Sequence, residues 1–288
     1  MKPLSLIAAG ALLLPIAAHA APLTAKQLIT GFDAVVLGDA TTTSEIVGPV
    51  LVGGNLGGGS NILDTANIPV TLPGYAQVDI YGNHTGVSVE GAHQSVDIGG
   101  SDLGSFLATT STTGYAFPET IAQITATLDA YSAALATMPA TGSYNPATGV
   151  FSGPADAVFD VAASAITKPI TGLTAGDIVN VTGTSWTDAN NYLTGDAIWN
   201  FPSATSVTIE QAFAGYILAP YADALVNTAP IEGIAAESYV GEGEIHWGPP
   251  LDPPVPTTSV REPSTLAALA VPMIVFGLIG RRRRRVTA

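Results

Sequence analysis

The sequence predicts a mainly β chain that winds into a β-solenoid with one long helix beside it. Short apolar runs of three to five residues recur along the chain, and most end in or near Gly. Runs of this length between turn residues are typical of short strands. Two of them, Ile217-Leu218 and Ile234-Ala235, start 17 residues apart, which suits stacked coils. A β-sandwich with an inserted helix is the alternative that this pattern allows.

The expected strands form two groups separated by a helical segment. The first group lies at residues 34–37, 50–52, 78–81, 87–90 and 96–98, and the second at 157–161, 177–181, 197–201 and 206–210. Trp199 alternates with Phe201, so both side chains should face the same side. Trp186, Trp199 and Trp247 are available to stack on sugars, but packing in the core is the default expectation for each.

One amphipathic helix is expected at about residues 118–138. Its apolar residues recur at steps of three and four: Ile121, Ile124, Leu128, Tyr131, Leu135 and Met138. Pro118 suits a first helical turn, Glu119 complements the helix dipole there, and Pro139 ends the helix. The apolar stripe is expected to pack against the strands rather than against a partner protein.

The basic residues of the chain are concentrated near its two ends. Between residues 21 and 260 only Lys26 and Lys168 are basic, against 22 acidic residues, so this part carries a formal charge of −20. Such an acidic body repels phosphate backbones, and nucleic-acid binding is therefore not expected. The chain has no cysteine, which excludes disulfides, thiolate metal sites and Cys nucleophiles.

Residues 1–20 have the three parts of a secretory signal peptide. Lys2 precedes an apolar run from residue 4 to 18, and Ala18-His19-Ala20 forms an A-x-A cleavage site. We expect signal peptidase to cut between Ala20 and Ala21, so that the mature chain is exported.

The C-terminal end has a different three-part layout. Residues 251–260 contain three prolines and predict a stiff, extended linker. The apolar run at 265–280 has 16 residues. As a helix it would be about 24 Å long, shorter than the roughly 30 Å core of a bilayer. The arginines that follow, Arg281, Arg282, Arg283, Arg284 and Arg285, should stay on the cytoplasmic side.

This layout of Glu262-Pro263, short apolar helix and Arg cluster at residues 261–288 resembles the PEP-CTERM sorting signal of Gram-negative bacteria. Members of that family usually carry Pro-Glu-Pro, whereas Arg261 precedes Glu262 here. The resemblance implies that an exosortase of the inner membrane recognises the signal. It also implies transient anchoring in that membrane and association with exopolysaccharide, biofilm and extracellular matrix.

Two sequence blocks within residues 21–250 resemble the choice-of-anchor A domain. The first runs from Gly31-Phe-Asp to Gly53-Gly-Asn55, and the second from Gly215-Tyr-Ile to Glu244-Ile-His246. This resemblance implies an adhesin-like domain with a right-handed β-helix, and it supplies no catalytic residues. A helix packed beside a solenoid is also similar in architecture to ice-binding solenoid proteins.

The sequence contains no enzymatic constellation. G-x-S-x-G, the Walker A loop and H-E-x-x-H are all absent. His84, Glu90 and His93 lie near one another and are weak metal candidates, although polar side chains on turns or an exposed face are the simpler interpretation. Carboxylates are available for calcium, but no EF-hand loop or Gly-Gly-x-Gly-x-Asp array predicts a calcium site. No cofactor is expected.

Three functions remain open at this point. The first is a non-enzymatic, exported cell-surface or matrix adhesin that binds extracellular polysaccharide or another surface. The second is an ice-binding solenoid, for which Thr41-Thr-Thr43 and Thr109 to Thr113 are not spaced as a regular ladder. The third is a polysaccharide-active β-helix enzyme, whose carboxylates cannot be paired from the sequence.

Overall fold

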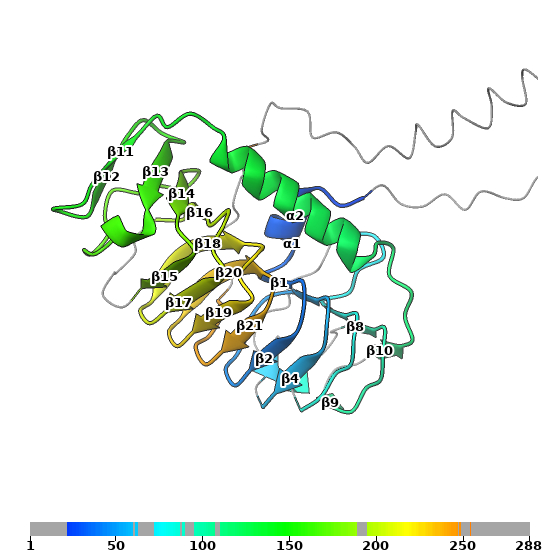
Figure 1. Ribbon diagram of the computed structural model, residues 1–288. Helices are drawn as coiled ribbons and strands as arrows, with labels where there is room; N and C mark the ends of the chain where they lie inside the picture. The colour runs from blue at the N-terminus through cyan, green and yellow to red at the C-terminus, as the bar shows by residue number, and fades with distance from the viewer. Residues whose placement is uncertain are drawn as a thin grey trace, which may run out of the picture.

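The chain folds as a β-solenoid with two helices on one side, as the computed structural model shows (Figure 1). It describes residues 22–59, 61–62, 72–86, 88–89, 95–106, 110–188, 195–246, 248 and 254. The predicted solenoid is therefore confirmed, and the β-sandwich alternative is wrong, because neighbouring strands of the stacked coils are parallel.

Three parallel sheets form the sides of the solenoid. The ten-stranded sheet contains, in spatial order, β10 (Thr110–Thr113), β8 (Ser95–Ile98), β6 (Val78–Ile80), β3 (Val50–Val52), β1 (Ala34–Val36), β20 (Ile231–Ala236), β18 (Phe213–Ala219), β16 (Ile198–Asn200), β14 (Ile178–Thr182) and β13 (Val158–Ala162). The six-stranded sheet contains β15 (Ser185–Asp188), β17 (Ser206–Ile209), β19 (Ala224–Asn227), β21 (Tyr239–Gly241), β2 (Ala40–Thr42) and β4 (Leu56–Gly58). The three-stranded sheet contains β5 (Asn61–Ile62), β7 (Ser88–Val89) and β9 (Ser105–Phe106).

The coils do not follow one another in simple chain order. The first half of the chain runs outward from β1 to β10, and helix α2 (Ile121–Ala136) then carries the chain back past the starting point. The second half begins at β13 and returns to β20, which pairs with β1. Strand β1 therefore lies in the middle of the ten-stranded sheet, between β3 and β20. We call this junction the seam.

The length of α2 matches the distance that it has to cover. Ile121 packs next to Gly53, just after β3, while the carbonyl of Leu135 accepts a hydrogen bond from Asn180 of β14. Five strand-to-strand steps separate β3 from β14. At about 4.8 Å per step this is about 24 Å, equal to the rise of a 16-residue helix at about 1.5 Å per residue.

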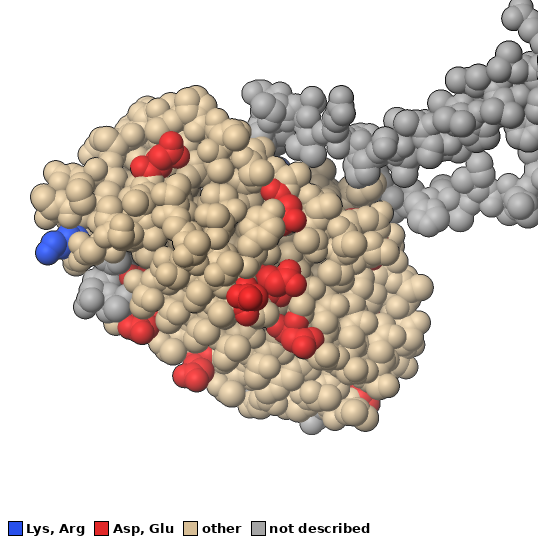
Figure 2. Space-filling view, in the orientation of Figure 1, with Lys and Arg blue, Asp and Glu red and all other residues tan. Residues whose placement is uncertain are grey.

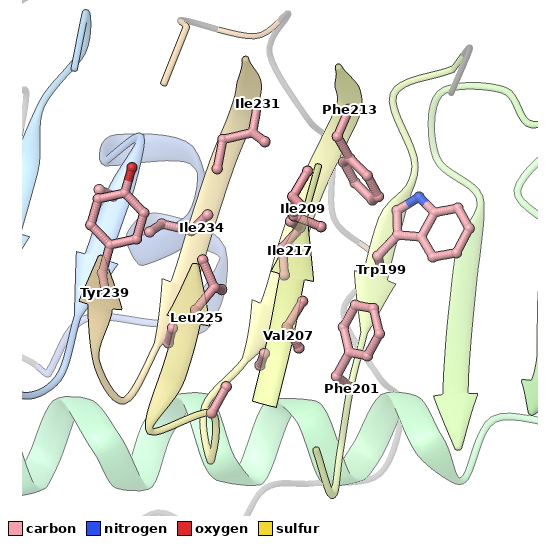
Figure 3. Close-up of a cluster of buried hydrophobic side chains, with 14 of the residues drawn as sticks. Trp199, Phe201, Val207, Ile209, Phe213, Ile217, Leu225, Ile231, Ile234 and Tyr239 are labelled. Atoms are coloured by element: carbon pink, nitrogen blue, oxygen red, sulfur yellow. The ribbon is translucent and has the colours of Figure 1, made fainter. Parts of the chain in front are cut away.

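Two apolar layers enclose the ten-stranded sheet. Its inward side chains pack inside the solenoid, where Trp199, Phe201 and Phe213 contribute the largest rings (Figure 3). The outward side chains of its strands from β3 to β13 are covered by α1 (Ala25–Gly31) and α2. Trp199 and Phe201 lie on the same side, as expected, and Trp186 packs parallel to Trp199 with the ring centroids 5.8 Å apart. Ile217 and Ile234 pair on adjacent coils, as their spacing predicted.

The helices begin differently from the expectation. Helix α2 starts at Ile121, two residues after Glu119, and Thr120 and Gln123 form a capping box at its N-terminus. Pro118 and Glu119 therefore lie outside the first turn, and the Glu119 carboxylate accepts the backbone N–H of Leu23 instead. Helix α1 was not predicted, because seven residues are too few to show a clear apolar period.

One end of the solenoid is closed by a hairpin and a short helical turn. Strands β11 (Ser143–Asn145) and β12 (Val150–Ser152) are antiparallel, and the 3-10 helix η1 covers Ala163–Ala165. Phe151 of β12 is buried and meets Phe159 of β13 edge to face at 5.0 Å. The hairpin thus covers the apolar end of the core.

A buried polar network fixes α2 on the sheet. The Asn200 amide donates to the Ser132 carbonyl at 2.9 Å and to the Asn180 side-chain oxygen at 2.9 Å, and it accepts the Ser132 hydroxyl. All three residues are buried. Buried polar groups of this kind cost free energy when one partner is removed, so the network selects one position of the helix.

A buried carboxyl marks the seam. The Asp33 N–H donates to the Pro49 carbonyl, and its own carbonyl accepts the N–H of Ile234. Asp33 thus joins the coil of β3 to the coil of β20. Burial raises the pKa of its carboxyl to about 8, although the backbone N–H of Gly48 donates to it. A side chain at Gly48 would collide with this carboxyl, so Gly is required there.

We predict that Asn200→Ala lowers the free energy of unfolding by about 2 to 4 kcal/mol, because it leaves polar groups of Ser132 and Asn180 buried without this partner. Urea unfolding of the purified protein measures the loss. Asn145→Ala is the matched control, since Asn145 is exposed and its side chain accepts only a local N–H. An equal loss in the two variants would contradict the role of the network.

We also predict a pH dependence that originates at Asp33. The folded pKa is raised from the ordinary 3.8 to about 8, so the stability that the protonated carboxyl provides is complete below about pH 4 and is lost as the pH rises towards about 8. Asp33→Asn should reduce this decline. The difference between the free energy of unfolding of the variant and that of the unmodified protein should therefore grow with pH. Exposed Asp223→Asn is the control. An advantage that is constant with pH would show that Asp33 is not the source.

Candidate functional site

The six-stranded sheet exposes every second side chain on the outer side of the solenoid. Trp186, Val207, Leu225 and Tyr239 point inward and are buried in the core. The residues between them alternate to the outside, as the burial of β15, β17, β19, β21 and β2 shows. No helix of the described chain covers this side (Figure 1).

The outward residues form a straight row across five strands. The pairing register aligns Thr187 with Thr208, Thr208 with Val226, Val226 with Val240, and Val240 with Thr41. We call Thr187, Thr208, Val226, Val240 and Thr41 the Thr–Val row. Gly57 of β4 pairs with Thr41 and extends the row, and the Thr85 hydroxyl lies beyond it on the next coil.

The Thr–Val row is bordered by small polar and acidic residues. On the side where the strands begin lie Ser185, Ser206 and Ala224, followed by exposed Asp223 and Asp39. On the side where the strands end lie exposed Glu210 and Glu242. Figure 2 shows a band free of charged residues between acidic residues on both sides. The row is thus an uncharged strip on an acidic protein.

A ladder of side-chain amides holds one corner beside the row. Asp39 Oδ1 accepts the N–H and the side-chain amide of Asn55, Asn55 Oδ1 accepts those of Asn83, and Asn83 Oδ1 accepts the N–H of Ser101. Successive coils are therefore aligned at this corner. The stretch 53–59 supplies Asn55 to the ladder and contains β4.

The geometry of the row suits an extended surface rather than a small molecule. Neighbouring side chains lie about 4.8 Å apart, the spacing of strands in a sheet. Each Thr offers one hydroxyl and one methyl group, and each Val two methyl groups. Long flexible side chains and aromatic rings are absent from the row itself. Such an array provides many weak, regularly spaced contacts and no enclosed pocket.

Of the three weak metal candidates, only His84 lies in the described part of the chain. His84 is fully buried, contrary to the simpler expectation of a polar residue at the surface, and its Nδ1 lies 3.0 Å from Asp102 Oδ1. Asp102 also accepts the N–H of Gly104. Glu90 and His93 lie outside the described residues. Among the residues that are described, no three His, Cys, Asp or Glu side chains are placed to hold a metal ion.

Sequence reasoning did not find the Thr–Val row. Thr41, Thr187 and Thr208 are far apart in the chain and share no motif; only the interleaved order of the coils brings them onto one sheet. The alternation at 185–188 and 206–209 was a usable signal, since each segment places two small polar residues on one face.

The residues of the predicted cleavage and sorting signals are not among those that the structure describes. Ala20, Ala21, Glu262, Pro263 and the five arginines at 281–285 lie outside the described residues, as does Trp247. Within the described ranges, neither helix is long and apolar enough to cross a membrane.

Comparison with known proteins gives one match. Residues 25–247 match the model of the family described as "Putative Ice-binding-like adhesive domain". Neither the curated proteins nor the solved structures contain a match to this chain. The matched range covers the whole solenoid, both helices and the Thr–Val row. The chain therefore belongs to the ice-binding-like adhesive domain family.

Proposed function

We propose that the protein is a non-enzymatic, adhesin-like protein of the cell surface or extracellular matrix that binds through the Thr–Val row. The family match supports an adhesive role, and the predicted signal peptide supports export. The observation that carries the proposal is the uncharged row itself, assembled from both halves of the chain on a broad sheet side that neither described helix covers.

The route to the surface is part of the same proposal. Residues 261–288 would be recognised by an exosortase after transient anchoring in the inner membrane of a Gram-negative bacterium. The ligand would be extracellular polysaccharide or another extended surface of the biofilm. The acidic residues beside the row favour a neutral ligand or one whose charges are screened.

Val240→Glu tests the binding surface. Val240 is the most exposed apolar residue of the row, at 44%. A carboxylate there would have to lose its water when a surface docks, and we expect retention on the exopolysaccharide of the producing cell to fall about tenfold, equivalent to about 1.4 kcal/mol.

Val150→Glu is the matched control. Val150 lies on the hairpin strand β12, has a similar exposure of 37% and belongs to another surface. It adds the same charge to the protein, so any general repulsion from the matrix affects both variants equally. Equal retention of the two variants would exclude the Thr–Val row as the binding surface. No retention of the unmodified protein on any matrix component would remove the adhesin proposal.

Ice is the second candidate ligand, and one observation favours it. Only Thr and Val occupy the five positions of a row with a regular strand spacing, so the hydroxyl and methyl groups can order water at fixed intervals. We expect thermal hysteresis in the unmodified protein and in Val150→Glu, and its loss in Val240→Glu. Thermal hysteresis near zero in the unmodified protein would exclude this candidate and leave the polysaccharide.

A further inference from the structure

The Pro-rich segment at 251–260 has one described residue, Pro254, and this residue contacts α2. The hydroxyl of Tyr131 donates a hydrogen bond to the Pro254 carbonyl at 3.1 Å. The two residues are 123 positions apart in the chain, and Tyr131 is only 6% exposed. The contact therefore joins the end of the domain to its helix layer.

Tyr131 is suited to bind a proline segment. A proline has no N–H, so Pro254 itself can be held only through its carbonyl oxygen and ring carbons. A fixed aromatic side chain that offers a hydroxyl and an apolar ring supplies both contacts, which is how aromatic surfaces bind polyproline II helices. Leu128 and Leu135, on the same face of α2, are fully buried and hold the ring in place.

The contact decides on which side the chain leaves the domain. Gly248 lies near Glu232, at the start of β20 in the ten-stranded sheet. Twelve residues on, at Val260, an extended chain can reach roughly 40 Å from that point, far more than the spacing of about 10 Å between packed sheets. An unattached segment could thus leave on any side. With Pro254 held by Tyr131, the remaining six residues start from the helix side of the solenoid, and their reach is about half as long, roughly 20 Å.

We propose that α2 is the docking surface for the chain's own Pro-rich segment, with the Tyr131 hydroxyl as its anchor, so that whatever follows residue 260 is attached on the helix side. The six-stranded sheet lies on another side of the solenoid from α2 (Figure 1). The Thr–Val row would therefore face away from the attachment point. This orientation rests on the proposed function of the row, whereas the docking contact does not.

The other end of the described chain supports the same arrangement. The N–H of Leu23 donates to Glu119, the residue just before the N-cap of α2, and α1 packs beside α2. Both ends of the domain thus lie on the helix layer, and no terminal segment has to cross the Thr–Val row.

Tyr131→Phe tests the anchor, because it removes the hydroxyl and keeps the ring. The chain has no cysteine, so Ala133→Cys on the exposed side of α2 and Thr258→Cys in the segment give one defined pair of spin labels. In the full chain with Tyr131 we expect one short, narrow distance distribution. In Tyr131→Phe the distribution should broaden about twofold, and proteolysis within 251–260 should accelerate about threefold to tenfold, the factor for one lost hydrogen bond.

Tyr144→Phe is the matched control, since the Tyr144 hydroxyl also donates to a backbone carbonyl, that of Ala165, at the hairpin end. It should leave both readouts unchanged. A broad distribution in the unmodified chain, or equal behaviour of the two variants, would overturn the proposal. The two proposals fail separately, because Val240→Glu should leave the label distances unchanged and Tyr131→Phe should leave the retention of the dissolved protein on the matrix unchanged.

Discussion

The pairing of β1 with β20 is the constraint on which the rest of the fold depends. Ala34 aligns with Ile234, so the first strand of the described chain meets β20 across 200 residues of chain. Before β20 pairs with it, β1 has one open edge, and its unpaired backbone groups could pair with a strand of another chain. Contacts of such sequence separation form slowly, because loop closure must precede them. The segments around residues 31–55 and 215–246 build this seam.

The seam in turn dictates where a binding surface can lie. An interleaved solenoid needs one element that returns the chain along the stack, and α2 does this at the length that five strand steps require. The return helix buries the outer side of the central ten-stranded sheet, so Val35, Leu51 and Leu218 face the helices rather than water. Neither α1 nor α2 covers the outer side of the six-stranded sheet, and the Thr–Val row lies there.

Local features of the fold could be predicted from the sequence, whereas long-range order could not. Strand positions followed from apolar runs and Gly, the α2 stripe from steps of three and four, and the shared side of Trp199 and Phe201 from alternation. The order of the coils leaves no local signal, so Thr41 could not be assigned to a row with Thr187 and Thr208. The burial of His84 was missed for the same reason, since its partner Asp102 lies one coil away. The signal peptide and sorting residues stay predictions, because they lie outside the described chain.

The side chains of the Thr–Val row explain how a surface without a pocket can bind. Val has one strongly preferred χ1 rotamer and Thr few, so these side chains are nearly ordered before any ligand arrives. Lys or Gln in the same positions would lose up to about 2 kcal/mol of rotamer freedom each on docking. The amide ladder of Asp39, Asn55 and Asn83 fixes neighbouring coils in register, which removes a further source of disorder. Weak contacts to a regular surface can then add up, because little entropy is lost for each one.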